Sequence, residues 1–261
     1  AADPAPTRFQ RFWLPGLAFK AVVIGGGYAT GRELAEFFLP SGPWGGLAAI
    51  LVATLIFSLV CAVTFLFARR VKAWDYITFF KALLGPGWIL FEGAYVLFIV
   101  LILAVYGAAA GAIGAALLGV PSIVGTAALA AAIVAIVTFG NRSVERMFAW
   151  VSYLLYAVYA IFIILAFTHF GEGISAGFEA GGPMTGWLSG GAVYAGYNLI
   201  GAVVILPVIR HLTSDRDAIV AGVIAGPLAT LPALLFFIAM VGFTPAIASA
   251  TLPSDFLLQR L

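Results

Sequence analysis

Seven long apolar segments follow one another along the chain, and short stretches between them hold most of the charged residues. A helix of about 20 residues crosses a hydrocarbon core about 30 Å thick, so each segment is long enough to span a membrane. The pattern therefore predicts an all-α polytopic membrane protein. The expected spans are 14–39, 45–68, 87–118, 121–139, 148–170, 186–209 and 218–243.

Among the stretches that precede and connect these spans, basic residues occur only in the N-terminal stretch and in every second connection. They are Arg8, Arg11, Arg69, Arg70, Lys72, Lys81, Arg142, Arg146, Arg210 and Arg216. The other connections contain no Lys or Arg and include Glu172 and Glu179. Because Lys and Arg concentrate in cytoplasmic loops, this pattern predicts a cytoplasmic N-terminus. Asp215 and Asp217 are expected to lie in a solvated loop and to serve at most as a helix cap.

The composition agrees with a membrane environment. Hydrophobic residues make up 63% of the chain, charged residues 9%, and the mean hydropathy is +1.11. A soluble domain has about 25% charged residues, so we expect the lipid bilayer as a partner and no nucleic acid. One cysteine and two histidines are too few for a zinc or haem site built from those ligands. The spans contain no catalytic constellation, so we expect neither an enzyme nor a bound organic cofactor.

Glycines cluster in the middle of the first predicted span, where residues 24–33 read Ile-Gly-Gly-Gly-Tyr-Ala-Thr-Gly-Arg-Glu. Each Gly costs a helix about 1 kcal/mol relative to Ala. Spaced glycines also allow close packing of intact helices, but three in a row exceed that need. Unwound backbone is tolerated in a membrane where it is buried in protein or lines a cavity. The run therefore favours an interrupted helix with a substrate site near the membrane midplane, formed by Gly25, Gly26, Gly27, Tyr28, Ala29, Thr30 and Gly31.

An unwound segment of this kind offers two types of ligand. The freed backbone carbonyls of Gly26 and Gly27 are suited to a cation such as Na⁺. The positive end of the following half-helix, near Ala29 and Thr30, is suited to a carboxylate. The expected substrate is therefore a small organic ion or zwitterion.

The charged residues near the first and third spans each have two interpretations. Arg32, Glu33 and Glu36 form either a solvated cluster with an Arg32–Glu36 pair, or a gate in which Arg32 closes against an acid on another helix. Glu92, near the start of the third span, either pairs with a loop cation such as Lys81 or relays protons. The sequence leaves both questions open.

The sixth predicted span is also interrupted by polar and small residues. A Gly-Tyr pair occurs in both spans, at 27–28 and 196–197, offset by 169 residues. Interrupted helices at corresponding positions in two halves indicate a transporter with inverted repeats. The residues of the sixth span assigned to the same site are Gly196, Tyr197, Asn198 and Gly201.

A repeat of five helices divides the chain into three parts. Residues 1–13 form an N-terminal tail, and residues 14–170 form the first repeat. Residues 186–261 hold helices 6 and 7 and the start of an extracellular lid. We therefore expect the chain as given to stop about three helices short of a complete second repeat.

Gly25 to Glu33, followed by Phe37-Phe38, resembles the first helix of the YkvI-like bacterial membrane proteins. These are distant relatives of the LeuT-type transporters in the amino acid–polyamine–organocation superfamily. The Gly-Tyr-Asn stretch of the sixth span and the ending from Leu252 to Leu258 extend the resemblance over the whole chain. The resemblance implies a LeuT-type inverted repeat, broken helices 1 and 6, and a multi-pass protein of the bacterial inner membrane. In LeuT-type proteins one sodium site also uses hydroxyl groups of helix 8, which has no counterpart in this sequence.

These observations favour an ion-coupled secondary active transporter for a small amino-acid-like or organic ion substrate. The coupling ion is expected to be Na⁺ or H⁺, and the substrate site lies between broken helices 1 and 6. Two alternatives stay open: a channel or passive facilitator, which also tolerates unwound backbone, and a non-transporting membrane subunit of the same fold.

Overall fold

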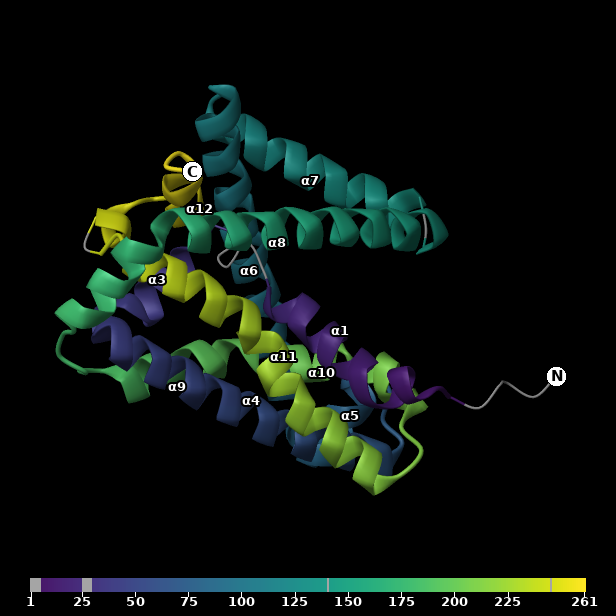
Figure 1. Ribbon diagram of the computed structural model, residues 1–261. Helices are drawn as coiled ribbons and strands as arrows, with labels where there is room; N and C mark the ends of the chain where they lie inside the picture. The colour runs from purple at the N-terminus through teal and green to yellow at the C-terminus, as the bar shows by residue number, and fades with distance from the viewer. Residues whose placement is uncertain (1–5, 25–29, 140, 245) are drawn as a thin grey trace.

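The computed structural model describes residues 6–24, 30–139, 141–244 and 246–261, and every regular element in these ranges is helical (Figure 1). By length and composition, four helical stretches in the described residues are able to cross a membrane. They are Arg32–Val71, Tyr76–Leu118, Ala157–Ala180 and Asp215–Val241. A fifth apolar stretch, Ser122–Ile136, is shorter. The prediction of an all-helical polytopic membrane protein is therefore supported.

Three predicted spans are absent from these four stretches: the fourth span corresponds to the shorter stretch Ser122–Ile136, and the first and sixth spans are interrupted. The first consists of α1 (Leu14–Val23) and α3 (Arg32–Phe37). The sixth consists of α9 (Trp187–Asn198), α10 (Gly201–Val204) and η4 (Leu206–His211). None of these pieces alone is long enough to cross the hydrocarbon core.

The remaining long helices match the predicted spans closely, with one exception. They are α4 (Gly42–Val71), α6 (Trp88–Leu118), α7 (Ser122–Phe139), α8 (Asn141–Ala180) and α11 (Asp215–Val241). The exception is α8, which begins before the predicted start at residue 148 and continues beyond the predicted end at residue 170. Ile174 is buried there, and the Phe178 ring packs edge-on against Trp44 with centroids 5.2 Å apart. These apolar contacts keep the added turns helical.

Short elements connect the long helices. They are η1 (Phe9–Trp13), η2 (Leu39–Ser41), α5 (Tyr76–Leu84), η3 (Gly85–Gly87), η5 (Ala246–Ser249) and α12 (Pro253–Leu258). α5 begins at an Asp75 cap, whose carboxylate accepts hydrogen bonds from the Thr78 amide at 2.8 Å and hydroxyl at 2.7 Å. These bonds stabilise the ionised carboxylate and lower the pKa of Asp75.

The most extensive helix packing among the described residues joins α4 and α11. A methyl group placed on Gly222 would lie 2.3 Å from the Ala62 Cα atom, and one on Gly226 would lie 2.4 Å from the Thr54 carbonyl oxygen. The hydroxyls of Thr54 and Thr230 are hydrogen-bonded across the same contact at 2.7 Å. Small residues thus bring the two backbones together, as is typical of membrane helices. α1 and α9 pack against this pair.

A second contact of the same kind joins α6 and α7. Gly107 and Gly111 of α6 face the Thr126 side chain of α7, and the Thr126 hydroxyl donates to the Gly107 carbonyl at 2.7 Å. The outward faces of α4 and α6, in contrast, expose large apolar side chains such as Leu59 and Leu90. Faces of this kind suit contact with lipid.

We predict that Gly222→Ala lowers the thermal unfolding temperature of the detergent-solubilised protein. The added methyl group meets α4 backbone that cannot rotate away, and overpacking of this kind costs about 1–3 kcal/mol. Gly93→Ala on α6 is the matched control, because no atom of the described residues lies within 4 Å of its new methyl group. Equal unfolding temperatures for the two variants would contradict the α4–α11 packing.

Candidate functional site

The interruption of the first span lies between Val23 and Arg32. α1 ends where Ile24 leaves helical geometry (φ −75°, ψ 80°). α3 begins after Gly31, which has a φ of +75°. A methyl group on Gly31 would lie 2.9 Å from the Phe236 ring, so both backbone conformation and space require glycine here. The predicted residues Gly25, Gly26, Gly27, Tyr28 and Ala29 lie outside the described residues and stay predictions.

The interruption of the sixth span lies between Asn198 and Gly201. The Asn198 side chain donates to the Tyr194 carbonyl at 3.0 Å, so it satisfies a backbone acceptor near the end of α9. Gly201 begins α10 against the side chains of α1, where a Cβ atom would lie 3.2 Å from both Phe19 and Val22. Glycine at this position therefore allows α10 to approach α1.

The two interrupted spans lie side by side and run in opposite directions (Figure 1). α10 contacts α1, and α9 contacts α3. On the α3 side, the Phe37 ring lies 6.0 Å from the Tyr194 ring and 5.8 Å from the Tyr197 ring, between centroids. Each of these contacts joins the first piece of one span to the second piece of the other. The breaks between the pieces therefore occur at a similar level of the bundle.

A polar cluster, formed by Glu33 of α3 with Tyr194 and Tyr197 of α9, lies beside the two breaks. The Glu33 carboxylate lies close to the Tyr197 hydroxyl, and it also acts electrostatically on the Tyr194 hydroxyl. Tyr194 is fully buried. Among the described residues, the Glu33 Oε2 atom and both hydroxyls have no hydrogen-bond partner of normal geometry. The structure thus brings together polar groups that the fold leaves unsatisfied.

Arg32 is held by the segment that follows α11. Its guanidinium donates to the carbonyls of Ala248 at 3.2 Å and Ala250 at 3.3 Å. The Ser254 amide donates to the Thr30 carbonyl at 3.0 Å, which fastens α12 to the same break. In the described part of the chain, neither predicted ion pair of Arg32 forms. The irregular backbone after α11 offers nearby carbonyls instead, and Glu36 is exposed.

Glu92 lies apart from this cluster, on α6. Its Oε1 atom accepts from the Tyr76 hydroxyl at 3.2 Å, and its Oε2 atom has no partner among the described residues. The predicted pair with Lys81 does not form, because the ammonium group lies 4.6 Å from the Trp88 ring centroid, over the ring. Tyr76 also lines a cavity of about 250 Å³ that reaches Ile200, within the break of the sixth span.

Two other predicted site residues, Thr30 and Gly196, lie in different surroundings. Thr30 is buried immediately before Gly31, at the break of the first span. Gly196, in contrast, lies on an exposed face of α9, and a methyl group added there would have no atom of the described residues within 4 Å. The assignment of Gly196 to the site therefore stays a prediction.

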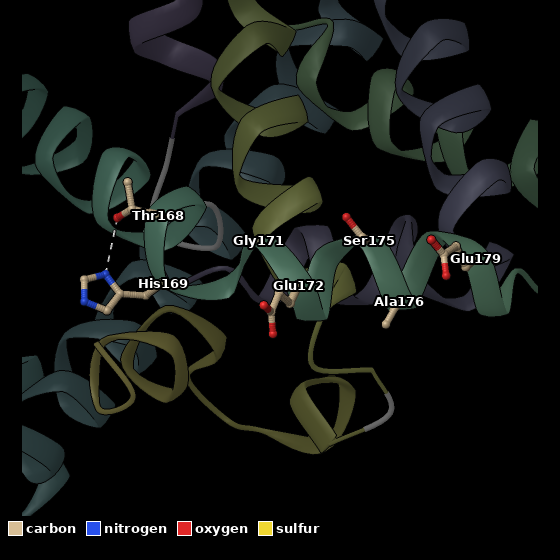
Figure 2. A pocket seen from close by; sticks show the side chains of 7 residues that line it. All are labelled: Thr168, His169, Gly171, Glu172, Ser175, Ala176 and Glu179. Carbon is tan, nitrogen blue, oxygen red and sulfur yellow. Dashed lines mark hydrogen bonds between the residues drawn. The ribbon is translucent and has the colours of Figure 1, made fainter.

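A wide depression of about 810 Å³ lies along the second half of α8 (Figure 2). Its polar lining includes His169, Glu172 and Glu179, and Figure 2 shows these side chains projecting from a single helix. None of the predicted site residues lines it. One helix face cannot enclose a small molecule, so we assign no site here.

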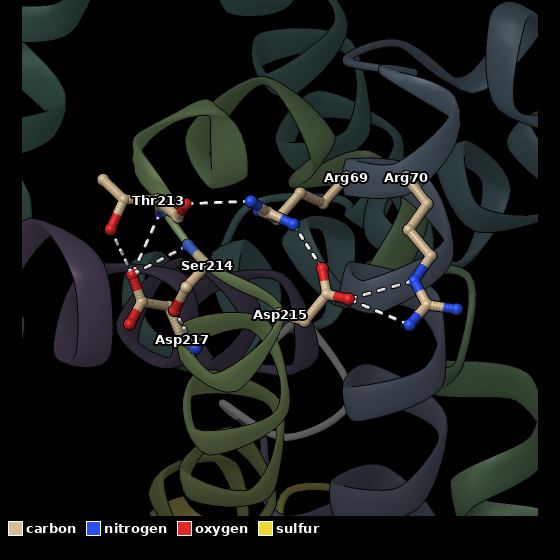
Figure 3. A network of polar contacts seen from close by, with 6 residues as sticks. All are labelled: Arg69, Arg70, Thr213, Ser214, Asp215 and Asp217. Atoms are coloured by element: carbon tan, nitrogen blue, oxygen red, sulfur yellow. Dashed lines mark hydrogen bonds and ion pairs between the residues drawn. The ribbon is translucent and has the colours of Figure 1, made fainter.

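The sequence analysis did not predict an ionic network that joins η1, the end of α4 and the start of α11. Asp217 is not solvated: its side chain is 3% exposed and accepts two hydrogen bonds from Arg11, at 2.7 and 2.8 Å. Asp217 also accepts from the Thr213 amide and hydroxyl, while the Ser214 hydroxyl caps α11 (Figure 3). The carboxylate of Asp217 raises the pKa of Arg11. The N-terminal turn η1 is thus fixed to α11.

The same network joins α4 to α11. Asp215 pairs with Arg69 and with Arg70, and Arg69 also donates to the Thr213 carbonyl at 2.8 Å (Figure 3). The partners are separated by about 145 residues, and only the fold brings them together. The Ser214-x-x-Asp217 spacing was the available signal, because it matches a capping box.

We predict that Asp217→Asn lowers the unfolding temperature more than Asp215→Asn does. Breaking a fully buried ion pair costs about 3–5 kcal/mol, and the partial exposure of Arg11 makes the loss at Asp217 smaller than that. The Asp215 side chain is 42% exposed, so its removal costs less still. Thermal unfolding of both variants in detergent checks this, and equal losses would contradict the role given to the Arg11–Asp217 pair.

Comparison with known proteins identifies one relative. The chain is 26% identical to the uncharacterized membrane protein YkvI of Bacillus subtilis over 245 residues, which cover 92% of this chain and 67% of the relative. No family model matches the chain, and no solved structure matches it. The similarity extends over nearly the whole sequence, and the described helices are those of a membrane protein. The chain is therefore similar to YkvI over nearly its whole length, and it is a membrane protein of helices, as the described residues also indicate.

Proposed function

We propose that this protein is an ion-coupled secondary active transporter for a small amino-acid-like or organic ion substrate. One observation carries the proposal: the two interrupted spans lie antiparallel and side by side, with α1 against α10 and α3 against α9. Broken helices in this arrangement provide backbone groups and helix ends at one level of the membrane, where transporters bind their substrates.

The proposed substrate site lies between the two breaks. We assign to it the predicted residues 25–31 of the first span, together with Tyr197 and Asn198 at the end of α9 and Gly201 at the start of α10. The fold proposed around it is a LeuT-type inverted repeat, in which α1 to α8 correspond to the first unit. The polar cluster supports this location, since buried polar groups without partners are rare outside functional sites.

The proposed coupling ion is Na⁺ or H⁺, and the two have different sites. Na⁺ would bind the backbone carbonyls of Gly26 and Gly27. A proton would be carried by Glu92, whose Oε2 atom has no partner within the described residues. Neither ion needs a resident cofactor, and we propose no catalytic step.

Gly26→Leu is expected to abolish uptake by the full-length protein in proteoliposomes, because a bulky side chain would occupy the substrate site proposed at the glycine run. Uptake of labelled amino acids is measured under an imposed Na⁺ or pH gradient, with an ionophore that collapses the gradient as a reference. Gly93→Leu is the control, because a methyl group there meets no described atom within 4 Å. Normal uptake by Gly26→Leu would refute the site, and uptake that never exceeds the external concentration would favour a passive facilitator.

Glu92→Gln separates the two coupling ions. If protons drive transport through Glu92, the variant is expected to lose the pH dependence of uptake while keeping its substrate affinity, because Gln still accepts from Tyr76 but cannot ionise. The measurement is the initial rate of uptake between about pH 5 and pH 8, the interval of physiological proton switching. Unchanged pH dependence in the variant would leave Glu92 with a structural role.

A further inference from the structure

The polar cluster of Glu33, Tyr194 and Tyr197 lacks a partner that the fold itself could supply. Three of its polar atoms have no hydrogen bond of normal geometry among the described residues, and Tyr194 is fully buried. Leaving one buried polar group unsatisfied costs about 1–3 kcal/mol, and the cost is higher for a charge. A cluster of three such atoms at one place therefore indicates a group that binds from outside the chain.

The charges around Glu33 indicate whether the group that binds there is a cation or an anion. Within the described residues, the three ion pairs all lie at the other end of the bundle, and none involves Glu33. The neighbouring Arg32 is turned away toward the carbonyls of Ala248 and Ala250. Another charge near Glu33 is the carboxylate of Glu36, which is negative as well. An ionised Glu33 would make the cluster anionic, so the cluster would attract a cation and repel an anion.

The chemistry of the cluster favours an ammonium group among cations. The hydroxyls of Tyr194 and Tyr197 and the Glu33 carboxylate present acceptor oxygens, and a primary ammonium has three donors to match them. Aromatic rings surround these oxygens: Phe37 and Phe38 both pack against Tyr194, and the two tyrosine rings meet edge to face at 5.9 Å. Ring faces also attract ammonium groups.

We infer that Glu33, Tyr194 and Tyr197 bind the ammonium group of the transported substrate. This inference rests on the proposed function only in calling the bound molecule a transported substrate. It assigns Glu33 a role as a binding residue, distinct from the gate or surface pair that the sequence leaves open. It also narrows the substrate class to molecules that carry a primary amine, such as amino acids and small alkylamines.

The test measures binding without transport. The full-length protein in detergent is titrated with methylammonium chloride at constant pH, and its thermal unfolding is followed by tryptophan fluorescence. A probe that binds the folded state raises the unfolding temperature with a concentration dependence that gives its affinity. Sodium chloride at the same ionic strength and tetramethylammonium chloride, which has no N–H donor, are the reference salts. We expect methylammonium to raise the unfolding temperature above both.

Two carboxylate variants one helical turn apart complete the test. Glu33→Gln is expected to weaken methylammonium binding about tenfold or more, because it removes a charge-assisted hydrogen bond. Glu36→Gln removes an equal charge from an exposed position of the same helix and is expected to leave the affinity unchanged. Tyr197→Phe, which keeps the ring and loses the hydroxyl, should lie between the two.

The outcomes separate this inference from the proposed function. Equal methylammonium affinity in wild type and Glu33→Gln, or no effect in wild type beyond that of sodium chloride, overturns the ammonium site even if uptake is intact. A Glu33-dependent effect of sodium chloride alone would assign the cluster to a coupling cation and overturn it as well. Loss of methylammonium binding in Glu33→Gln but not Glu36→Gln supports the site even if no uptake is found. The unfolding temperature without added salt verifies that each variant is folded.

Discussion

A membrane supplies no water to the backbone, and this constraint governs the whole arrangement. Helices that break within an apolar span leave amides and carbonyls that only protein can satisfy. Here the two broken spans pack against each other, α1 against α10 and α3 against α9. Local hydrogen bonds satisfy some of the remaining groups: the Asn198 side chain donates to the Tyr194 carbonyl of its own helix, and the Ser254 amide donates to the Thr30 carbonyl.

The α4–α11 contact is the frame that holds the broken spans. Glycines at 222 and 226 bring the two backbones close together, and the paired threonine hydroxyls fix the contact. Both helices are continuous, and where Pro227 removes a backbone bond from α11 the Ser58 hydroxyl of α4 donates to the Val223 carbonyl at 2.9 Å. At the Arg–Asp end the same two helices are joined by Asp215, and η1 is joined to them by Asp217. The broken spans are thus flanked by regular elements joined at two levels.

Patterns among neighbouring residues predicted where most of the helices lie. Contacts between residues far apart in the sequence were not predicted. The apolar runs placed α4, α6 and α11 to within a few residues, and the glycine runs placed the ends of α1 and α9. The Arg11–Asp217 pair joins residues 206 positions apart, and nothing in the sequence relates them. The turn of Arg32 toward carbonyls depends on where the segment after α11 lies. The extra turns of α8 depend on Trp44, which belongs to another helix. In each case tertiary packing decided the outcome.

The bond from Ser254 to Thr30 has a mechanical consequence. A carbonyl that an intact helix would have used within itself is used to hold a separate part of the chain. Arg32 adds two further attachments to the same part, through Ala248 and Ala250. Any displacement of α3 that keeps these bonds must carry η5 and α12 with it, so the three elements would move as one unit. Gly31, whose backbone lies in the left-handed region, is the residue at which this unit meets the break in the first span.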